Sequence, residues 1–184
     1  MITQLDLAIL DWIRHTLHCG FLDFLMPLIT LFGEDGIFWI AMALILTAIP
    51  KTRKIGFGMV LALALDYLLC NLLIKPLVAR PRPWTHRPGL EEELKLLVKL
   101  PTDYSFPSGH TAASFASASA IFFRTRKWGT PALILAALIG LSRLYLYVHF
   151  PTDVLCGALL GILCGFAAVW MVRQLRQDRN LQES

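Results

Sequence analysis

The chain has 184 residues, of which 56% are apolar and 16% charged, and its mean hydropathy is +0.59. A soluble domain carries about 25% charged residues to cover its surface. The 17 basic and 13 acidic residues are too few for that purpose, which argues against a soluble enzyme, a disordered chain and a nucleic-acid-binding protein. An integral membrane protein is the class that fits this composition.

The predicted elements begin with a short amphipathic segment over residues 1–18, which mixes apolar with charged residues. We expect it to lie near the membrane interface. It lacks the basic start and the cleavage site of a signal peptide. Residues 20–33 form a first apolar run, short for a crossing that needs about 20 residues. Whether residues 1–33 form one helix or two stays open at this stage.

Further apolar runs cover residues 37–49, 55–74, 108–123, 131–142 and 154–172. The sequence therefore predicts an all-α, polytopic membrane bundle of about six transmembrane helices, forming one domain over residues 1–184. The last run contains Gly157, Gly161 and Gly165, a spacing that allows close helix packing. The four cysteines, which form no CxxC or zinc spacing, are interpreted as small apolar core residues.

Basic residues cluster in the segments 51–54, 124–127 and 173–184. An even number of crossings would place these segments on one side of the membrane, and the positive-inside rule makes that side cytoplasmic. Both termini are then expected in the cytoplasm. The long, proline-rich polar region over residues 76–107 is expected on the extracytoplasmic face, so the protein is predicted to be a multi-pass cell-membrane protein.

Residues suited to binding phosphate stand at the outer ends of the apolar runs. Lys75, Arg82 and Arg143 are three cations that can neutralise a phosphate and the charge on its equatorial oxygens. Ser108 is a favoured N-cap residue, and Gly109 lets the backbone approach an oxyanion closely. A helix beginning there would offer free N–H groups to an anion.

Two histidines and a carboxylate share the same membrane face. His110 and His149 allow a division of labour, in which one attacks phosphorus and the other protonates the leaving oxygen. Asp153 is placed to hold the attacking imidazole in the right tautomer. Charges beside a bilayer are costly and mark function by default. The set therefore predicts phosphoryl transfer.

Three motifs over residues 75–83, 107–110 and 142–153 carry a family resemblance. They read Lys75-x6-Arg82-Pro83, Pro107-Ser108-Gly109-His110 and Ser142-Arg143-x5-His149-x3-Asp153. In this order, each at the outer end of an apolar run, they resemble the signature of the type 2 phosphatidic acid phosphatase (PAP2) family.

The resemblance implies a role for each motif residue. His149 would be the nucleophile that forms a phosphohistidine, Asp153 its support, and His110 the acid for the leaving group. The phosphate would be held by Lys75, Arg82, Ser108, Gly109 and Arg143. The family needs no metal or other cofactor. The sequence agrees, because it has no compact carboxylate cluster for magnesium and no zinc spacing.

The implied function is a membrane lipid-phosphate phosphatase. Small members of the family resemble bacterial enzymes that act on undecaprenyl diphosphate or phosphatidylglycerol phosphate. Undecaprenyl diphosphate is favoured because the short loops leave little protein outside the bilayer to recognise a large soluble substrate. Phosphatidylglycerol phosphate and phosphatidate stay open as substrates. A lipid phosphotransferase with the same intermediate and a non-catalytic lipid-phosphate transporter are the alternative functions, although a transporter would not need both histidines.

The expected partners are the bilayer and a lipid phosphate, with no nucleic acid. The sequence leaves the oligomeric state open, a homo-oligomer included. Asp66 lies inside an apolar run and outside the motifs, and we interpret it as a buried structural partner rather than a site residue.

Overall fold

The computed structural model describes residues 2–95 and 97–182, with side chains as far as residue 175, and these residues contain helices and no strand. Within them, four stretches are long and apolar enough to cross a membrane: Gly20–Ala48, Arg53–His86, Arg126–Tyr145 and Pro151–Leu175. This confirms the expected all-α membrane bundle. The helices are α1 (Ile2–Leu17), α2 (Gly20–Leu31), η1 (Glu34–Gly36), α3 (Ile37–Ala48), α4 (Arg53–Asp66), η2 (Tyr67–Ile74), α5 (Lys75–Val78), η3 (Pro83–His86), α6 (Leu90–Lys95), α7 (Gly109–Phe122), α8 (Arg126–Tyr145) and α9 (Pro151–Gln182).

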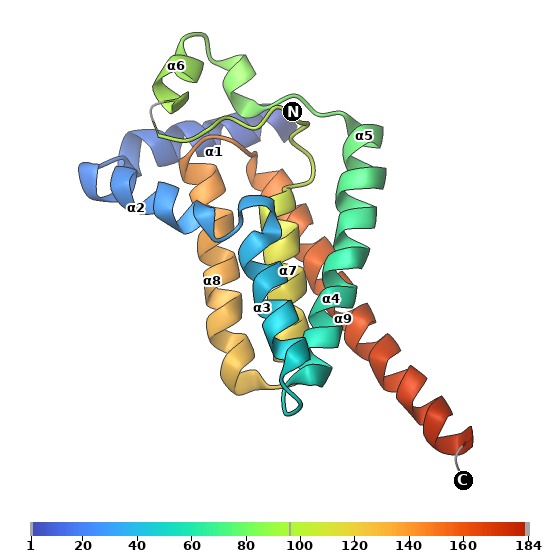
Figure 1. Ribbon diagram of the computed structural model, residues 1–184. Helices are drawn as coiled ribbons and strands as arrows, with labels where there is room; N and C mark the ends of the chain where they lie inside the picture. Colours follow the sequence, from blue (N-terminus) through green and yellow to red (C-terminus); the bar gives the residue numbers. More distant parts are fainter. Residues whose placement is uncertain (1, 96, 183–184) are drawn as a thin grey trace.

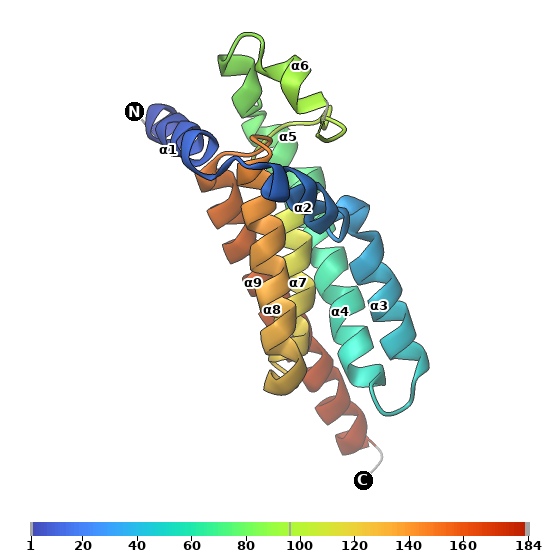
Figure 2. The ribbon, with the colours of Figure 1, turned by 90° about the vertical axis from the view of Figure 1, so that its left-hand side faces the viewer.

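Helix α7 lies in the middle of the bundle, where it packs against α4, α8 and α9 (Figures 1 and 2). Its sequence explains this position, because alanine and serine fill most of its length and leave room for neighbouring helices on several sides. Ala112, Ala116 and Ala120 are fully buried there. Trp39 of α3 donates a 2.9 Å hydrogen bond from its indole nitrogen to the Ser114 hydroxyl, which fastens α3 to α7.

The three spaced glycines of α9 form the closest helix contact. A Cβ atom at Gly161 would lie 2.3 Å from the carbonyl oxygen of Ala112, and one at Gly165 would lie 2.8 Å from that of Ala116. At Gly157 the nearest atom would be the Ser108 carbonyl oxygen at 2.8 Å. Real Cβ atoms do not approach so closely, so these positions require glycine for α9 to pack against α7 as it does.

The first two helices lie across one end of the bundle instead of running along it (Figures 1 and 2). This answers the question about residues 1–33, which form two helices that meet at Cys19. The run 20–33 does not traverse the bundle alone, and α1 lies at the end of the bundle opposite to the end of α9 (Figure 1). Because α2 has only 12 residues, it is shorter than a crossing requires.

Helices α4, η2 and α5 form one continuous rod that carries Lys75 to the same end of the bundle as α1 (Figure 1). The rod ends at Val78, where Ala79 takes a positive φ of 46°. Pro81 and Pro83 disfavour helical backbone at the residues before them, so helix resumes only at Pro83, the first residue of η3. The polar region that follows, with η3 and α6, covers this end of the bundle.

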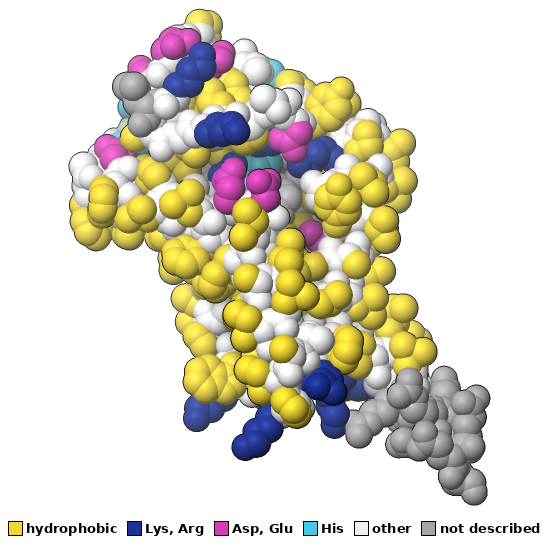
Figure 3. All heavy atoms as spheres, viewed as in Figure 1, with side chains coloured by type: hydrophobic (Ala, Val, Ile, Leu, Met, Phe, Trp, Pro, Cys, Tyr) yellow, Lys and Arg dark blue, Asp and Glu magenta, His cyan; other side chains and the backbone are white. Residues whose placement is uncertain are grey.

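The two ends differ in charge. Lys and Arg side chains gather at one end, while acidic, basic and histidine side chains surround a hollow near the other (Figure 3). Between the ends the flank is apolar, and residues such as Leu155, Leu159 and Leu163 of α9 are more than half exposed. An exposed apolar belt of this kind is what a bilayer covers.

Candidate active site

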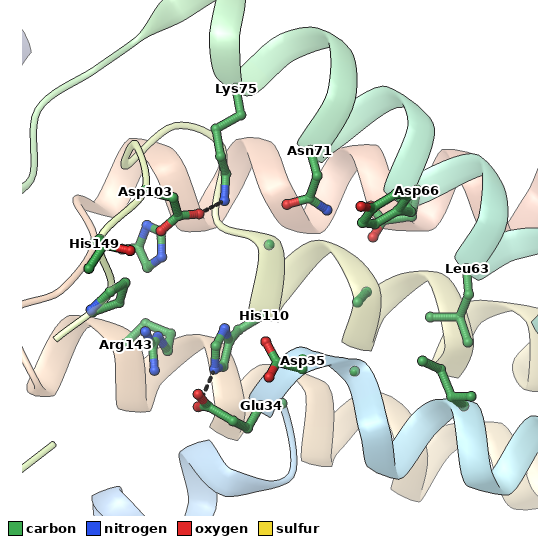
Figure 4. A pocket seen from close by; sticks show the side chains of 18 of the residues that line it. Glu34, Asp35, Leu63, Asp66, Asn71, Lys75, Asp103, His110, Arg143 and His149 are labelled. Atoms are coloured by element: carbon green, nitrogen blue, oxygen red, sulfur yellow. Dashed lines mark hydrogen bonds and ion pairs between the residues drawn. The ribbon is translucent and has the colours of Figure 1, made fainter. Parts of the chain in front are cut away.

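A cavity of about 740 Å³ opens at the end of the bundle that α1 and α2 cover. Its walls come from the turn before α3, the α4–η2–α5 rod, the start of α7 and the polar loop around residues 99–103. Figure 4 shows the polar side chains of these elements pointing toward one another. The motif residues that line it are Lys75, Arg82, Gly109, His110, Arg143 and His149.

His149 lies in the loop between α8 and α9, and its side chain is 2% exposed. Its Nε2 is 2.9 Å from Nη1 of Arg82. A guanidinium is always a donor, so Nε2 accepts this hydrogen bond and the ring proton is assigned to Nδ1. Burial, together with the nearby cations Arg82 and Arg143, holds the pKa of His149 well below its usual range. The ring is therefore neutral at pH 7, with its lone pair directed to the cavity cations.

Asp153 stands behind His149 and outside the cavity wall. Its Oδ2 lies 3.5 Å from Nδ1 of His149, which is within ion-pair distance but lacks hydrogen-bond geometry. The same Oδ2 accepts the backbone N–H of Phe150 at 3.0 Å and the hydroxyl of Ser105. The other oxygen, Oδ1, accepts from Nη1 of Arg80 at 2.6 Å. The carboxylate is thus fully buried and held from three directions.

Arg143 lies on the last turn of α8 and is 1% exposed. Its Nη1 donates to the hydroxyl of Thr30 at 2.6 Å, so α2 helps to place it. Its Nε has no hydrogen-bond partner among the described residues. A buried donor on the cavity wall that lacks a partner is suited to an anionic ligand.

Asp103 is a cavity residue that the sequence reasoning missed. Its carboxylate forms ion pairs with both Lys75 and Arg82. Burial alone would raise the pKa of Asp103, but these two cations outweigh burial and lower the pKa to about 2. The carboxylate thus occupies the cations expected to hold phosphate. Its position shortly before the second motif was the one sequence signal for this residue. A lone Asp in a polar loop, however, looks like an ordinary surface residue.

His110 begins α7 and has an acidic neighbour from another element. Its Nε2 lies 3.2 Å from Oε2 of Glu34, in the turn before α3 (Figure 4). Gly33 allows this approach, since a Cβ atom there would lie 2.8 Å from Cδ2 of His110. In the sequence, residues 34–36 stand out only as the break between two apolar runs. Their proximity to His110 depends on how α3 packs against α7, which the local pattern does not reveal.

Ser108 caps α7, as its residue type predicted. Its hydroxyl accepts from the backbone N–H of Thr111 at 3.4 Å and lies 2.9 Å from the Thr111 hydroxyl. The side chain is fully buried and does not line the cavity. Gly109 does line it, and a Cβ atom there would lie 3.7 Å from Nζ of Lys75. The structure therefore places Gly109, rather than the Ser108 side chain, beside the cations.

Asp66 lies deeper in the same cavity, on the α4–η2–α5 rod with Asn71 (Figure 4). It is 2% exposed, and its Oδ1 has no hydrogen-bond partner among the described residues. The interpretation of Asp66 as buried is confirmed. However, Asp66 also lines the cavity, so it is not separate from the site as expected.

No group of three or more His, Cys, Asp or Glu side chains that could hold a metal ion occurs in the described part of the chain.

Comparison with known proteins gives three kinds of match. Residues 55–177 match the PAP2 superfamily. The undecaprenyl-diphosphatase of Sulfolobus acidocaldarius is 33% identical over 149 residues, which cover 80% of this chain and 69% of that protein. Phosphatidylglycerophosphatase B of Bacillus subtilis is 33% identical over 174 residues, covering 89% of this chain and 75% of that protein.

Solved structures agree. The crystal structure of Aquifex aeolicus LpxE matches with a TM-score of 0.72 and 30% identity, covering 90% of this chain and 94% of that one. The PAP2-type phosphatidylglycerolphosphate phosphatase from Bacillus subtilis matches with a TM-score of 0.73 and 28% identity, covering 96% and 87%. The fold, the site and these relatives define an integral membrane phosphatase that acts on lipid phosphates. The chain belongs to the PAP2 superfamily.

Proposed function

We propose that the protein hydrolyses the terminal phosphate of an isoprenoid diphosphate, with undecaprenyl diphosphate as the favoured substrate. The observation that supports hydrolysis is the orientation of the His149 ring, whose unprotonated Nε2 faces the cavity cations. The names of the Sulfolobus relative and of undecaprenyl-diphosphatase BcrC of Bacillus subtilis, 31% identical over 153 residues, support the substrate.

In the proposed reaction, Nε2 of His149 attacks the terminal phosphorus and an N–P bond forms, while the bond from that phosphorus to the bridging oxygen breaks and the lipid monophosphate leaves. His110 gives a proton to the leaving oxygen. Water then attacks the phosphohistidine and passes a proton to His110, while the N–P bond breaks and phosphate is released. Asp153 stabilises the imidazole as it becomes positively charged.

The phosphate oxygens are assigned to Lys75, Arg82, Arg143 and the backbone at Gly109. All four line the cavity, and the Nε atom of Arg143 is free to donate. Fixed cations stabilise the charge on the equatorial oxygens of the transferring group. Ser108 contributes indirectly, because its cap fixes the start of α7.

The deeper cavity wall supports a lipid rather than a soluble substrate. Leu63, Ile40 and Tyr67 line it, and Ile40 and Tyr67 are also 45% and 57% exposed on the apolar flank of the bundle. A substrate held by its phosphate could therefore leave its chain in the bilayer beside α3 and the α4–η2–α5 rod. A lipid chain that stays in the bilayer is already out of water, so the protein needs no further pocket to hold it.

We place the cavity on the extracytoplasmic face. Lys51, Arg53 and Lys54 lie in or beside the turn between α3 and α4, and Arg126 and Lys127 begin α8, all at the end far from the cavity. The positive-inside rule makes that end cytoplasmic. The C-terminus is then cytoplasmic, while α1 and α2 lie on the outer interface.

The test is a phosphate-release panel with purified protein. It compares undecaprenyl diphosphate, phosphatidylglycerol phosphate, phosphatidate and a soluble phosphate ester, each with and without a chelator. We expect the isoprenoid diphosphate to have the highest kcat/KM and the chelator to have no effect. A higher value for phosphatidylglycerol phosphate would overturn the substrate, and strict dependence on magnesium would overturn the mechanism. Phosphate recovered on an added alcohol instead of water would identify a phosphotransferase.

A further inference from the structure

Arg80 is a partly buried cation beside the site that has no place in the roles proposed so far. It lies in the unassigned part of the first motif, two residues before Arg82, and its side chain is 15% exposed. Its guanidinium joins two buried carboxylates, Asp153 and Asp6. We propose that Arg80 and Asp6 are positioning residues, which hold Asp153 in the orientation that supports His149. This inference rests on the roles proposed above for His149 and Asp153.

The contacts of Arg80 fix its guanidinium on several sides. Nη1 donates to Oδ1 of Asp153 at 2.6 Å and to the Thr152 hydroxyl at 2.7 Å. Nη2 donates to Oδ2 of Asp6 at 2.7 Å. The guanidinium carbon lies 3.8 Å from the centroid of the Phe150 ring. Arg80 therefore holds the turn from Phe150 to Asp153, which directly follows His149.

Asp6 completes this arrangement from α1. It is 2% exposed, and its oxygens also accept from the backbone N–H of Thr152 at 3.2 Å and from the Thr152 hydroxyl at 2.6 Å. A buried carboxylate is costly without partners. Its position here makes it the counter-ion that orients the Arg80 fork, which is a bidentate donor suited to two acceptors.

The two carboxylate oxygens of Asp153 face different partners. Arg80 takes Oδ1, so Oδ2 stays on the side of His149, 3.5 Å from Nδ1. Without Arg80, Oδ1 would lose this hydrogen bond, and the carboxylate would be held through Oδ2, by the Phe150 N–H and the Ser105 hydroxyl, and would be less firmly oriented. A displacement of about 1 Å can cost about 10²-fold in rate, because attack requires aligned atoms.

A control variant on the same helix, α1, separates a purely structural role of these contacts from a role in catalysis. Asp11 of α1 forms an ion pair with Arg87 and accepts the Tyr147 hydroxyl at 2.6 Å. It therefore docks α1 on the same loops without touching Asp153. Asp11→Asn removes a docking contact of similar kind and leaves the Asp153 carboxylate held.

The experiment measures kcat, KM and thermal unfolding of purified Asp6→Asn, Arg80→Gln, Arg80→Lys and Asp11→Asn. We expect Arg80→Gln to lower kcat about 10- to 100-fold with KM changed less than about twofold, because only the chemical step loses alignment. Arg80→Lys should recover part of kcat. Asp11→Asn should lower the unfolding temperature while keeping kcat within about twofold.

A double-mutant cycle then tests whether Asp6 acts through Arg80. Asp6→Asn should lower kcat in the wild-type background and have little further effect in Arg80→Gln. The proposal is overturned if Asp11→Asn loses as much kcat as Asp6→Asn, if Arg80→Gln keeps wild-type kcat, or if the two effects simply add. His149→Ala separates the levels: turnover by that variant would refute the proposed function, whereas an inactive His149→Ala beside a fully active Arg80→Gln would refute only the positioning proposal.

Discussion

In the proposed reaction, Arg82 must exchange its two present partners for phosphate oxygens. In the structure its Nη1 donates to Nε2 of His149, and its Nη2 pairs with Asp103. The proposed nucleophile and two of the proposed phosphate-binding cations, Lys75 and Arg82, therefore have partners before substrate arrives. A phosphate must displace the Asp103 carboxylate from Lys75 and Arg82, and Arg82 must turn from Nε2 to a phosphate oxygen. Because every anion has to displace the same Asp103 carboxylate, these contacts weaken the binding of each anion by the same factor.

We therefore predict that Asp103→Asn tightens anion binding. KM for the lipid substrate and the inhibition constants of phosphate and vanadate should fall by one common factor, about three- to tenfold, since each ligand no longer competes with the carboxylate. Inhibition kinetics measure this, with Glu92→Gln on exposed α6 as the charge-matched control. An increase in these constants would show instead that Asp103 holds Lys75 and Arg82 in their binding positions.

A second prediction separates the two histidines. His149→Ala should abolish turnover on all substrates, because no phosphohistidine can form. His110→Ala should fail on lipid substrates but keep more activity on a nitrophenyl phosphate, whose leaving oxygen departs without an acid. Phosphate release on both substrates measures the difference. An equal loss on both substrates in His110→Ala would remove its assignment as the acid.

At the scale of elements, the site depends on how α7 is held. Its first turn carries Gly109 and His110, and Gly157 of α9 lies against the backbone of Ser108. The sequence predicted close packing of the last helix, because its spaced glycines are a local pattern, but it did not predict that the partner would be α7. It did not predict the contacts of Arg80, Glu34 and Asp103, since each depends on elements that meet only after folding. Asp6 offered a weak signal as a charge between the apolar residues Leu5 and Leu7 of α1.

Gly161→Ala tests this packing. The added Cβ would lie 2.3 Å from the Ala112 carbonyl oxygen and 2.8 Å from the Ala116 nitrogen, both backbone atoms that cannot rotate away. We expect a loss of about 1–3 kcal/mol in the free energy of unfolding, seen as a lower unfolding temperature in detergent. Gly20→Ala is the matched control, because no atom lies within 4 Å of its added Cβ. Equal stability of the two variants would argue against the close α7–α9 contact.

At the scale of the whole molecule, both ends of the helical bundle are polar and the flank between them is apolar. Each motif stands where an apolar run stops, and the structure brings residues of all three motifs to one cavity. The local pattern did not decide how residues 1–33 are arranged, because a run as short as 20–33 can either cross the bundle or lie flat. Helices α1 and α2 lie across the site end, and the contacts of Asp6 and Thr30 make both of them part of the site's support.

Cysteine labelling tests the orientation in whole cells. In a variant whose four cysteines are replaced, a membrane-impermeant thiol reagent should react with Gln4→Cys and Glu92→Cys but not with Arg126→Cys. Gln4 and Glu92 are exposed at the cavity end, and Arg126 is exposed at the opposite end. Labelling of Arg126→Cys alone would reverse the orientation. Labelling of Glu92→Cys without Gln4→Cys would return α1 to the cytoplasmic side.

His149 is proposed to carry the phosphoryl group during turnover, and trapping the phosphorylated protein tests this role. Protein mixed with a substrate labelled in its terminal phosphate is denatured at alkaline pH within one turnover, digested and examined by mass spectrometry. We predict label on His149, and none after the same treatment of His149→Ala. Label on His110 or any other residue, or turnover without label on the protein, would contradict the mechanism.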